Sequence, residues 1–211
     1  MNLKEMALIG LLGALAAILM LFKFPLPFMP PFLSFDLSGL LEIIGGFTLG
    51  PAAAVFIILV KILVKFVMMG TTSALTGEIQ NVILSCAYVL PAVWFYDHKK
   101  TKKNAILGMI LGTAVCSAIS VFTNLYLIIP FYVNLAGMSM EGIITMCSKV
   151  NPLMKDAFTM AVYGIFPFNL IKCGITSAIT FIVYKKISRP MRHFIQKDRP
   201  AVKLPERGYN K

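Results

Sequence analysis

Charged side chains are scarce in this sequence, and acidic ones are the scarcest. Only 14% of the 211 residues are charged, 9 are Asp or Glu, and 2 are His. Soluble domains carry about 25% charged and about 45–50% apolar residues. Here 58% of the residues are hydrophobic and the mean hydropathy is +0.80. This composition excludes an ordinary soluble fold and predicts an all-α integral membrane protein.

The sequence motifs of common enzyme classes are also missing. The chain has no G-x-x-x-x-G-K-[ST] phosphate loop, no H-E-x-x-H zinc motif and no G-x-S-x-G nucleophile motif. His98 and His193 both lie in basic polar segments, which excludes a histidine-based site within the membrane. We therefore expect no enzyme. If the protein moves a ligand uphill, the energy comes from an ion gradient or from a partner.

The cysteines show no pattern typical of a metal site or of a set of disulfide bonds. The 4 cysteines are scattered and form no C-x-x-C pair. Three of them lie in apolar stretches, where a free cysteine behaves as a small buried hydrophobe. We expect no disulfide framework, no metal site and no resident cofactor.

Long apolar runs predict six membrane-spanning helices in one domain, residues 1–186, followed by a basic cytoplasmic tail, residues 187–211. A span needs about 20 apolar residues. The spans are expected at 3–22, 38–49, 52–69, 78–96, 104–129 and 159–184. The second span is short and ends at the Gly50-Pro51 turn signal. The connections are expected at 23–37, 70–77 and 130–158, the last with a short amphipathic helix near 140–149.

The first apolar run also resembles a secretion signal, with Ala14-Leu15-Ala16 as a possible cleavage site. However, Glu5 interrupts the basic start that such a signal needs, and the run continues to Phe22. We expect a retained helix.

Lysine and arginine are distributed unevenly between the two sides of the predicted bundle. Most of the 20 fall in H-K-K-T-K-K (98–103) and in the tail, which lie on the same side when there are six spans. The positive-inside rule then places both termini in the cytoplasm. The basic clusters flank apolar segments and do not form a face along a polar helix. They therefore favour anionic lipid head groups over nucleic acid as a partner.

Several polar side chains interrupt the apolar spans. Asn169 and Lys172 lie three residues apart and share one helix face. A charge near the bilayer centre costs about 2.5–3.5 kcal/mol on insertion scales. Asn124 must also face protein or a cavity, since lipid offers its amide no partner. Tyr126 and Tyr132 nearby are typical of membrane interfaces. Together these groups suit a flat organic ligand with a polar edge.

Two lysines lie within the third span. Lys65 is near its outer end, so we expect its ammonium group to snorkel to the interface. Lys61 is nearer the middle, where an ion pair with a buried acid is the leading interpretation and direct ligand contact the alternative. Glu78 has a second interpretation as an acid that favours the dipole at a helix start. The available acids are Asp36, Glu42 and Glu78.

Small residues recur along the first span. Gly10-x-x-x-Ala14 and Gly13-x-x-x-Ala17 form a face that allows another helix to approach closely. That helix belongs either to this chain or to another membrane subunit.

Several segments together resemble the riboflavin-specific S components of energy-coupling factor (ECF) vitamin transporters. F-P-L-P and F-D-L-S lie around the start of the second span and T-G-E-I-Q-N at the start of the fourth. T-N-L-Y-L-I-I-P-F-Y ends the fifth span, and F-P-F-N-L-I-K lies within the sixth. The similarity extends over about residues 3–186. It implies a bundle of six membrane helices like that of ECF S components, with a high-affinity flavin pocket open to the outside. The implied partners are a transmembrane coupling subunit and two cytoplasmic ATPase subunits, in the plasma membrane of a prokaryote.

The same resemblance implies roles for particular residues. Asn169 and Lys172 would bind the polar edge of the isoalloxazine, because its carbonyl groups and ring nitrogens need donors. Small residues on the first helix would dock onto the coupling subunit. The docking residues expected are Gly10, Gly13, Ala14 and Ala17. The substrate-binding residues expected are Phe35, Asp36, Leu37, Glu78, Asn81, Asn124, Tyr132, Asn169 and Lys172.

The choice of ligand is open at this point. The chain has G-L-L-E (39–42) where members of that family have an acid, a hydrophobe and proline, and it has Lys61-Ile62 where they have Lys-Asn. Riboflavin is the expected transported ligand, with FMN, another flavin analogue or another vitamin as alternatives. A stand-alone ion-coupled carrier, with Glu42 or Glu78 as its proton site, is the alternative from a different class.

Overall fold

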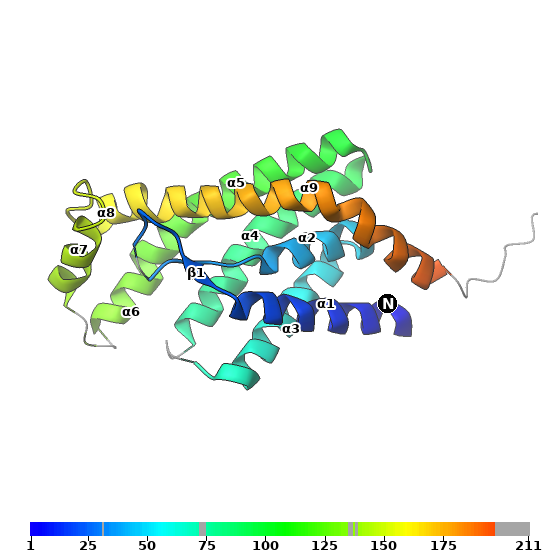
Figure 1. Ribbon diagram of the computed structural model, residues 1–211, viewed down its shortest axis with the longest axis horizontal. Helices are drawn as coiled ribbons and strands as arrows, with labels where there is room; N and C mark the ends of the chain where they lie inside the picture. The colour runs from blue at the N-terminus through cyan, green and yellow to red at the C-terminus, as the bar shows by residue number, and fades with distance from the viewer. Residues whose placement is uncertain (31, 72–74, 135–136, 138, 197–211) are drawn as a thin grey trace, which may run out of the picture.

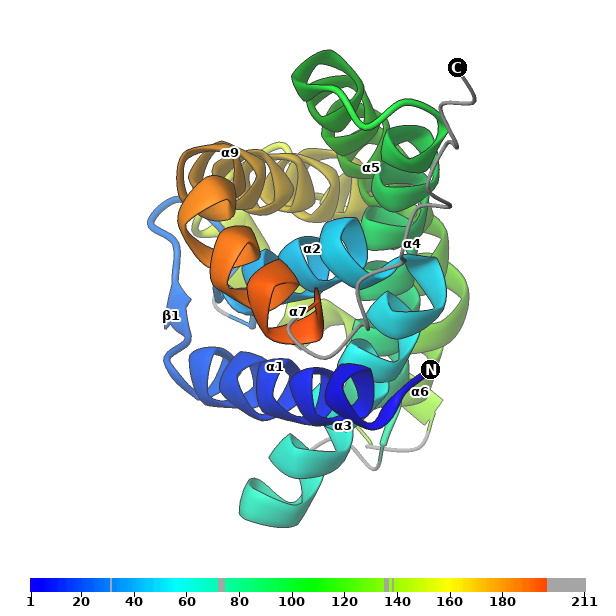
Figure 2. The same ribbon diagram turned by 90° about the vertical axis from the view of Figure 1, so that its right-hand side faces the viewer.

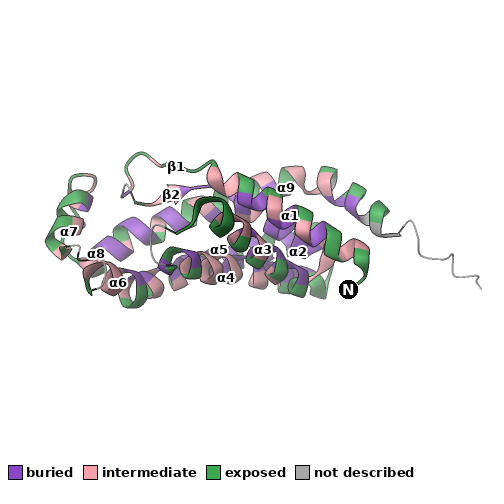
Figure 3. Cartoon of the chain, turned by 90° about the horizontal axis from the view of Figure 1, so that it is seen from below, coloured by how far each residue is buried: buried purple, intermediate pink, exposed green. Residues whose placement is uncertain are grey.

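The structure is a computed structural model that describes residues 1–30, 32–71, 75–134, 137 and 139–196 (Figure 1). Helices make up nearly all of the described chain, as the hydropathy predicts. Their outward faces carry large exposed hydrophobic side chains, such as Leu107, Ile110 and Phe181. Buried residues follow the inward faces of the same helices (Figure 3). This arrangement is that of a bundle surrounded by lipid.

Within the residues that the structure describes, five helical stretches are long and apolar enough to cross a membrane: Leu3–Leu21, Pro51–Met69, Thr76–His98, Lys102–Asn134 and Ala157–Tyr184. The first three are α1, α3 and α4. The fourth joins α5 (Lys102–Thr123), the π-helical turn η1 (Asn124–Ile128) and α6 (Ile129–Asn134). The fifth joins α8 (Ala157–Met160), the π-helical turn η2 (Ala161–Ile165) and part of α9 (Phe166–Gln196).

The predicted second span is α2, Ser38–Leu49, with the same bounds as expected. Its 12 residues extend for about 18 Å, whereas the hydrocarbon core is about 30 Å thick. Helix α2 is therefore a sixth apolar helix of the bundle, but it is too short to cross the hydrocarbon core by itself. Gly50 ends it with a φ of 97°, and Pro51 begins α3 at the first helical position, where its missing N–H costs nothing.

Helix α2 lies in the middle of the bundle (Figures 1 and 2). It contacts α1, α3, α4 and α9, and eight of its residues are buried. Ile43 and Ile44 are completely buried and belong to two different apolar clusters on opposite sides of the helix. Since none of its residues is fully exposed, the buried polar groups of this central helix must find their partners inside the protein.

Helices α4 and α5 pack together closely because of two glycines. Gly108 and Gly112 on α5 face the backbone of α4 at Ala92 and Tyr88. A Cβ atom at Gly108 would lie 2.6 Å from the Ala92 carbonyl oxygen, and one at Gly112 would clash with the Tyr88 carbonyl oxygen. Small residues at this spacing let helix backbones approach each other in membranes.

At one end of the bundle the chain forms small elements that surround the site described below. Strands β1 (Phe24–Pro25) and β2 (Ser34–Phe35) pair antiparallel, and the rings of Phe24 and Phe35 lie 5.2 Å apart. The amphipathic helix expected near 140–149 is α7, Met140–Ser148. The Ser139 side chain caps it by accepting a hydrogen bond from the Gly142 N–H at 3.1 Å.

The last helix is longer than predicted. The membrane domain was expected to end at residue 186, but α9 continues to Gln196. Its final turns pack on α1: Met191 is buried in a cluster with Leu8, and the Lys4 Nζ atom donates to the Phe194 carbonyl oxygen at 3.2 Å. The residues after 186 are rich in basic side chains, and for this reason they were predicted to form a polar tail and not a helix. The rest of the expected tail, 197–211, lies outside the described residues, as do positions 72–74 of the loop expected at 70–77.

We predict that Gly112→Ala lowers the free energy of unfolding by about 1–3 kcal/mol, because the added methyl group overpacks the contact between α4 and α5. Thermal unfolding in detergent measures the loss. The control is Gly174→Ala, since nothing lies within 4 Å of a Cβ atom at Gly174. It should unfold at the wild-type temperature or above. Equal melting of the two variants would contradict the close contact.

Candidate functional site

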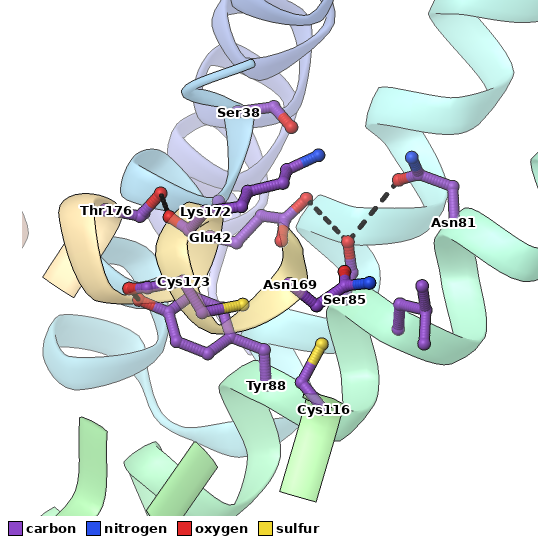
Figure 4. A pocket seen from close by; sticks show the side chains of 12 residues that line it. Ser38, Glu42, Asn81, Ser85, Tyr88, Cys116, Asn169, Lys172, Cys173 and Thr176 are labelled. Carbon is purple, nitrogen blue, oxygen red and sulfur yellow. Dashed lines mark hydrogen bonds between the residues drawn. The ribbon is translucent and has the colours of Figure 1, made fainter. Parts of the chain in front are cut away.

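A polar cavity lies inside the bundle between α2, α4, α5 and α9 (Figure 4). Its volume is about 60 Å³, enough for a few water molecules. Ligand pockets usually measure about 300–1,000 Å³, so a vitamin-sized ligand has to widen this cavity. The lining residues are Ser38, Gly39, Glu42, Asn81, Leu84, Ser85, Tyr88, Cys116, Asn169, Lys172, Cys173 and Thr176.

Two helix faces supply most of the polar lining. On α4, Asn81 is followed by Ser85 and Tyr88, four and seven residues later. On α9, Asn169 is followed by Cys173 and Thr176 at the same intervals. Positions i, i+4 and i+7 share one face of a helix, so each set points in one direction. Asn81 and Asn169, the first member of each set, were predicted site residues; the other members were not, although their spacing is visible in the sequence.

The predicted pair Asn169 and Lys172 lies on this cavity, and Lys172 is held by an acid. Its Nζ atom lies 2.6 Å from Oδ2 of Asp36, in the loop after β2. The other oxygen, Asp36 Oδ1, accepts hydrogen bonds from the N–H and hydroxyl of Ser38 at 3.0 and 2.5 Å. This ion pair joins the loop between α1 and α2 to the last helix.

The surroundings of Asp36 keep its carboxyl group charged. Burial alone would raise its pKa, but the charge of Lys172 and the hydrogen bonds from Lys172 and Ser38 outweigh burial and lower the pKa to about 2. The carboxylate therefore stabilises the fold above its unfolded-state pKa of 3.8, and this contribution disappears only as the pH falls through about 2. The ion pair is intact at any physiological pH.

Glu42, on the cavity wall, forms a second ion pair with Lys61, which does not line the cavity. The Lys61 Nζ atom lies 2.5 Å from Glu42 Oε1, and both side chains are 0% exposed. Lys61 also donates to Asn81 Oδ1 at 2.7 Å and to Ser85 Oγ at 3.1 Å. The Ser85 hydroxyl in turn donates to Glu42 Oε1 at 3.3 Å. This confirms the buried ion pair expected for Lys61 and identifies Glu42 as its partner among the three available acids.

Lys65 forms an ion pair with Glu78 and is 16% exposed. Its ammonium group also donates to the carbonyl oxygen of Gly70, the C-cap residue of α3, at 3.2 Å. Its snorkelling to the membrane interface stays a prediction. The Thr71 hydroxyl donates to the other Glu78 oxygen at 3.1 Å. Glu78 is not among the lining residues of the polar cavity, so the structure gives it a role in joining α3 to α4 and does not place it beside Asn81 on the cavity wall.

Asn124 and Tyr132 belong to a different cavity. It measures about 240 Å³ and has an almost wholly apolar lining. Its other lining residues are Phe32, Ile128, Ile129, Ile143, Met160 and Ile165. Asn124 begins the π-helical turn η1 and donates its Nδ2–H to the Ser120 carbonyl oxygen at 2.7 Å. The predicted site residues are therefore divided between two cavities in this structure, and their meeting in one ligand site stays a prediction.

The two cavities are neighbours. Ile165 lines the apolar cavity, and its carbonyl oxygen accepts a hydrogen bond at 2.9 Å from Nδ2 of Asn169, which lines the polar cavity. Phe35 and Leu37 line neither of them: Phe35 is buried against Phe24, and Leu37 precedes the first residue of α2. The π-helical turns at η1 and η2, which contact each other beside these cavities, had no recognisable sequence signal.

The four small residues of α1 divide into two pairs. Gly13 and Ala17 are buried, and a Cβ atom at Gly13 would lie 2.5 Å from the Val60 side chain of α3. Packing within the chain is therefore the correct interpretation for this pair, and docking is wrong for it. Gly10 and Ala14 remain partly exposed. Within the described part of the chain, no three His, Cys, Asp or Glu side chains are grouped so that they could hold a metal ion.

We predict that Lys61→Met alone lowers the free energy of unfolding by about 3–5 kcal/mol, since it leaves the buried Glu42 carboxylate without its counter-charge. The double variant Glu42→Leu/Lys61→Met should recover most of this loss, because apolar groups of similar size replace the whole pair. Thermal unfolding of the three proteins in the same detergent measures both effects. A double variant that is less stable than the single one would refute this account of the pair.

Comparison with known proteins gives consistent matches. The family model "ECF transporter, substrate-specific component" matches residues 4–184. The riboflavin transporter RibU of Staphylococcus aureus is 31% identical over 88% of this chain and 90% of that protein. The riboflavin transporter FmnP of Bacillus subtilis is 25% identical over 89% and 93%. A solved S component of a bacterial ECF transporter superposes with a TM-score of 0.70 at 26% identity, covering 90% of this chain and 98% of that one.

Proposed function

Because this chain belongs to the substrate-specific components of ECF transporters, we propose that it binds riboflavin within the membrane and mediates its uptake with an ECF coupling module. Two relatives similar over most of the chain are named riboflavin transporters. The structural feature that best supports this proposal is the polar cavity inside the bundle. An ammonium group, amides and hydroxyl groups line it. Such a lining suits a planar heterocycle with carbonyl groups and ring nitrogens along one edge.

We propose that the flavin occupies both cavities once the polar one widens. Lys172 and Asn169 would hold the polar edge of the ring system, and the apolar cavity beside Asn124 and Tyr132 would receive its hydrocarbon part. The positions of Asn169 and Ile165 support this arrangement: Asn169 lines the polar cavity, Ile165 lines the apolar one, and the two residues are one helical turn apart and joined by a hydrogen bond. The loop with Phe35, Asp36 and Leu37 would cover the ligand, since Asp36 already contacts Lys172.

The partners follow from the family. We propose docking onto a transmembrane coupling subunit served by two cytoplasmic ATPases, in the plasma membrane of a prokaryote. Both termini would face the cytoplasm, as the distribution of Lys and Arg predicts. The partly exposed Gly10 and Ala14 on α1 offer the docking face.

A stand-alone proton-coupled carrier is less well supported. It needs a carboxyl group that exchanges protons during transport, with Glu42 and Glu78 as the candidates. Each of them forms an ion pair with a lysine, so a proton cycle at either carboxyl group would have to break that pair. Uptake in cells that lack the coupling subunit separates the two functions: a carrier would accumulate riboflavin undiminished.

Purification from flavin-replete cells tests the ligand directly. The protein in detergent should carry a visible flavin absorption band that co-elutes with it, or should quench the fluorescence of added riboflavin. A colourless preparation that leaves riboflavin fluorescence unchanged would rule out the proposed function.

We predict that Lys172→Ala weakens riboflavin binding at least tenfold, about 1.4 kcal/mol, because the polar edge of the flavin loses an ammonium donor. Fluorescence titration measures the affinity. The control is Lys155→Ala, which removes an exposed lysine outside both cavities. Unchanged affinity in Lys172→Ala would remove this residue from the binding site.

We predict that Ala14→Trp abolishes uptake and leaves riboflavin affinity unchanged, since a bulky ring on the partly exposed face of α1 keeps the coupling subunit from approaching. Radiolabelled uptake and fluorescence titration measure the two properties separately. Leu107→Trp on α5 serves as control, because it adds the same ring at a 41% exposed position away from α1. If Ala14→Trp loses binding as well, this position serves folding instead.

A further inference from the structure

Glu42 contains an unusual atom. Its Oε2 is the one buried side-chain oxygen or nitrogen in the described part of the chain that has no hydrogen-bond partner. The side chain is completely buried, and both oxygens of an ionised carboxylate are strong acceptors. Leaving one of them unpaired in a low-dielectric interior is costly, so such an atom calls for an explanation.

The other carboxylate oxygen holds the group in place. Oε1 lies 2.5 Å from the Lys61 ammonium group and accepts from the Ser85 hydroxyl, so the carboxylate cannot rotate to share these partners without losing them. Lys61 itself is fixed by Asn81 and Ser85. The arrangement presents Glu42 with one oxygen bound to the protein and the other without a partner.

Glu42 lies on the wall of the polar cavity, together with Lys172 and Asn169. Figure 4 shows its carboxylate beside the Lys172 side chain and opposite Ser85. The Lys61 ammonium group already stands where a cation would approach Oε1, so a metal ion is not the partner that this geometry favours. The geometry around Oε2 instead favours a hydrogen bond from a neutral N–H or O–H group.

We propose that Glu42 is a ligand-binding residue whose Oε2 accepts a hydrogen bond from an N–H or O–H group of the flavin. This inference rests on the proposed function and names the chemistry that the same site recognises. The donor is either the imide N–H of the ring system or a hydroxyl group of the ribityl chain. Both are uncharged, and a hydrogen bond to a carboxylate is about twice as strong as one between neutral groups.

The charges around the cavity agree with a neutral ligand that carries both donors and acceptors. Lys172 is paired with Asp36, and Lys61 is paired with Glu42, so the charge of each ammonium group is already balanced by a carboxylate of this chain. The imide edge of a flavin places an N–H between two carbonyl groups. Lys172 and Asn169 supply donors for carbonyl oxygens, and Glu42 supplies the acceptor that the N–H needs.

The test compares two double variants that differ only at position 42. Glu42→Gln/Lys61→Met retains a carbonyl oxygen there, and Glu42→Leu/Lys61→Met does not. Both remove the buried charges together, which keeps the fold neutral at this site. Fluorescence titrations of the full chain in detergent use riboflavin, 3-methylriboflavin, which lacks the imide N–H, and lumiflavin, which lacks the ribityl chain.

We expect the Leu variant to bind riboflavin at least tenfold more weakly than the wild type and the Gln variant to bind within about threefold of it. The Leu variant should also lose the preference of the wild type for riboflavin over one of the two analogues. A lost preference over 3-methylriboflavin identifies the imide as the donor, and a lost preference over lumiflavin identifies the ribityl chain.

Two outcomes would overturn the inference. One is wild-type affinity in the Leu variant, which is also what a water molecule satisfying Oε2 would produce. The other is an equal loss for all three flavins, which would indicate a structural role. If neither double variant folds, Glu42→Asp serves instead, because it keeps the charge but withdraws the oxygen by one methylene group; unchanged affinity there also refutes the inference. A wild-type protein that binds no flavin refutes the proposed function itself.

Discussion

The hydrocarbon interior of a membrane offers no hydrogen-bond partner, and this constraint organises the whole bundle. Each polar side chain on a membrane helix has to find its partner within the protein. Lys61 reaches Glu42, Lys65 reaches Glu78, and Lys172 reaches Asp36. These three contacts join α3 to α2, α3 to α4, and α9 to the loop before α2. They explain why the short helix α2 is central: it carries a charge that only a fully enclosed helix can keep.

The helices themselves were largely predictable from the sequence, because their signals are local. An apolar run and the Gly50-Pro51 turn predicted α2 with its observed bounds, and the amphipathic pattern near 140–149 predicted α7. The end of α9 was not predictable in this way. Its last ten residues look like a polar tail, and they are helical because Met191 and Phe194 meet α1, which is distant in sequence. The two π-helical turns were likewise not predictable, because no local sequence pattern indicates them.

The candidate site was predictable in part. Asn169, Lys172 and Asn81 do lie on one cavity, since a buried amide or ammonium group in a span must face protein. Their neighbours Ser85 and Thr176 follow from helical spacing. The choice among three acids for Lys61 was not predictable, because it depends on how α2 and α3 are rotated against each other. Asn124 also satisfied the same argument yet faces a second cavity, since burial alone does not say which interior space a side chain meets.

The contact between Asp36 and Lys172 has a consequence for the energetics of transport. Asp36 is attached to the same chain as the ammonium group that is proposed to bind the ligand, so it competes for that group at a high effective concentration. A ligand that binds Lys172 has to displace the Asp36 carboxylate or share the ammonium group with it, so the observed affinity is lower than the intrinsic one. A ligand that took hydrogen bonds from Lys172 would leave as the ion pair with Asp36 re-forms, so the contact that lowers the affinity would also assist release.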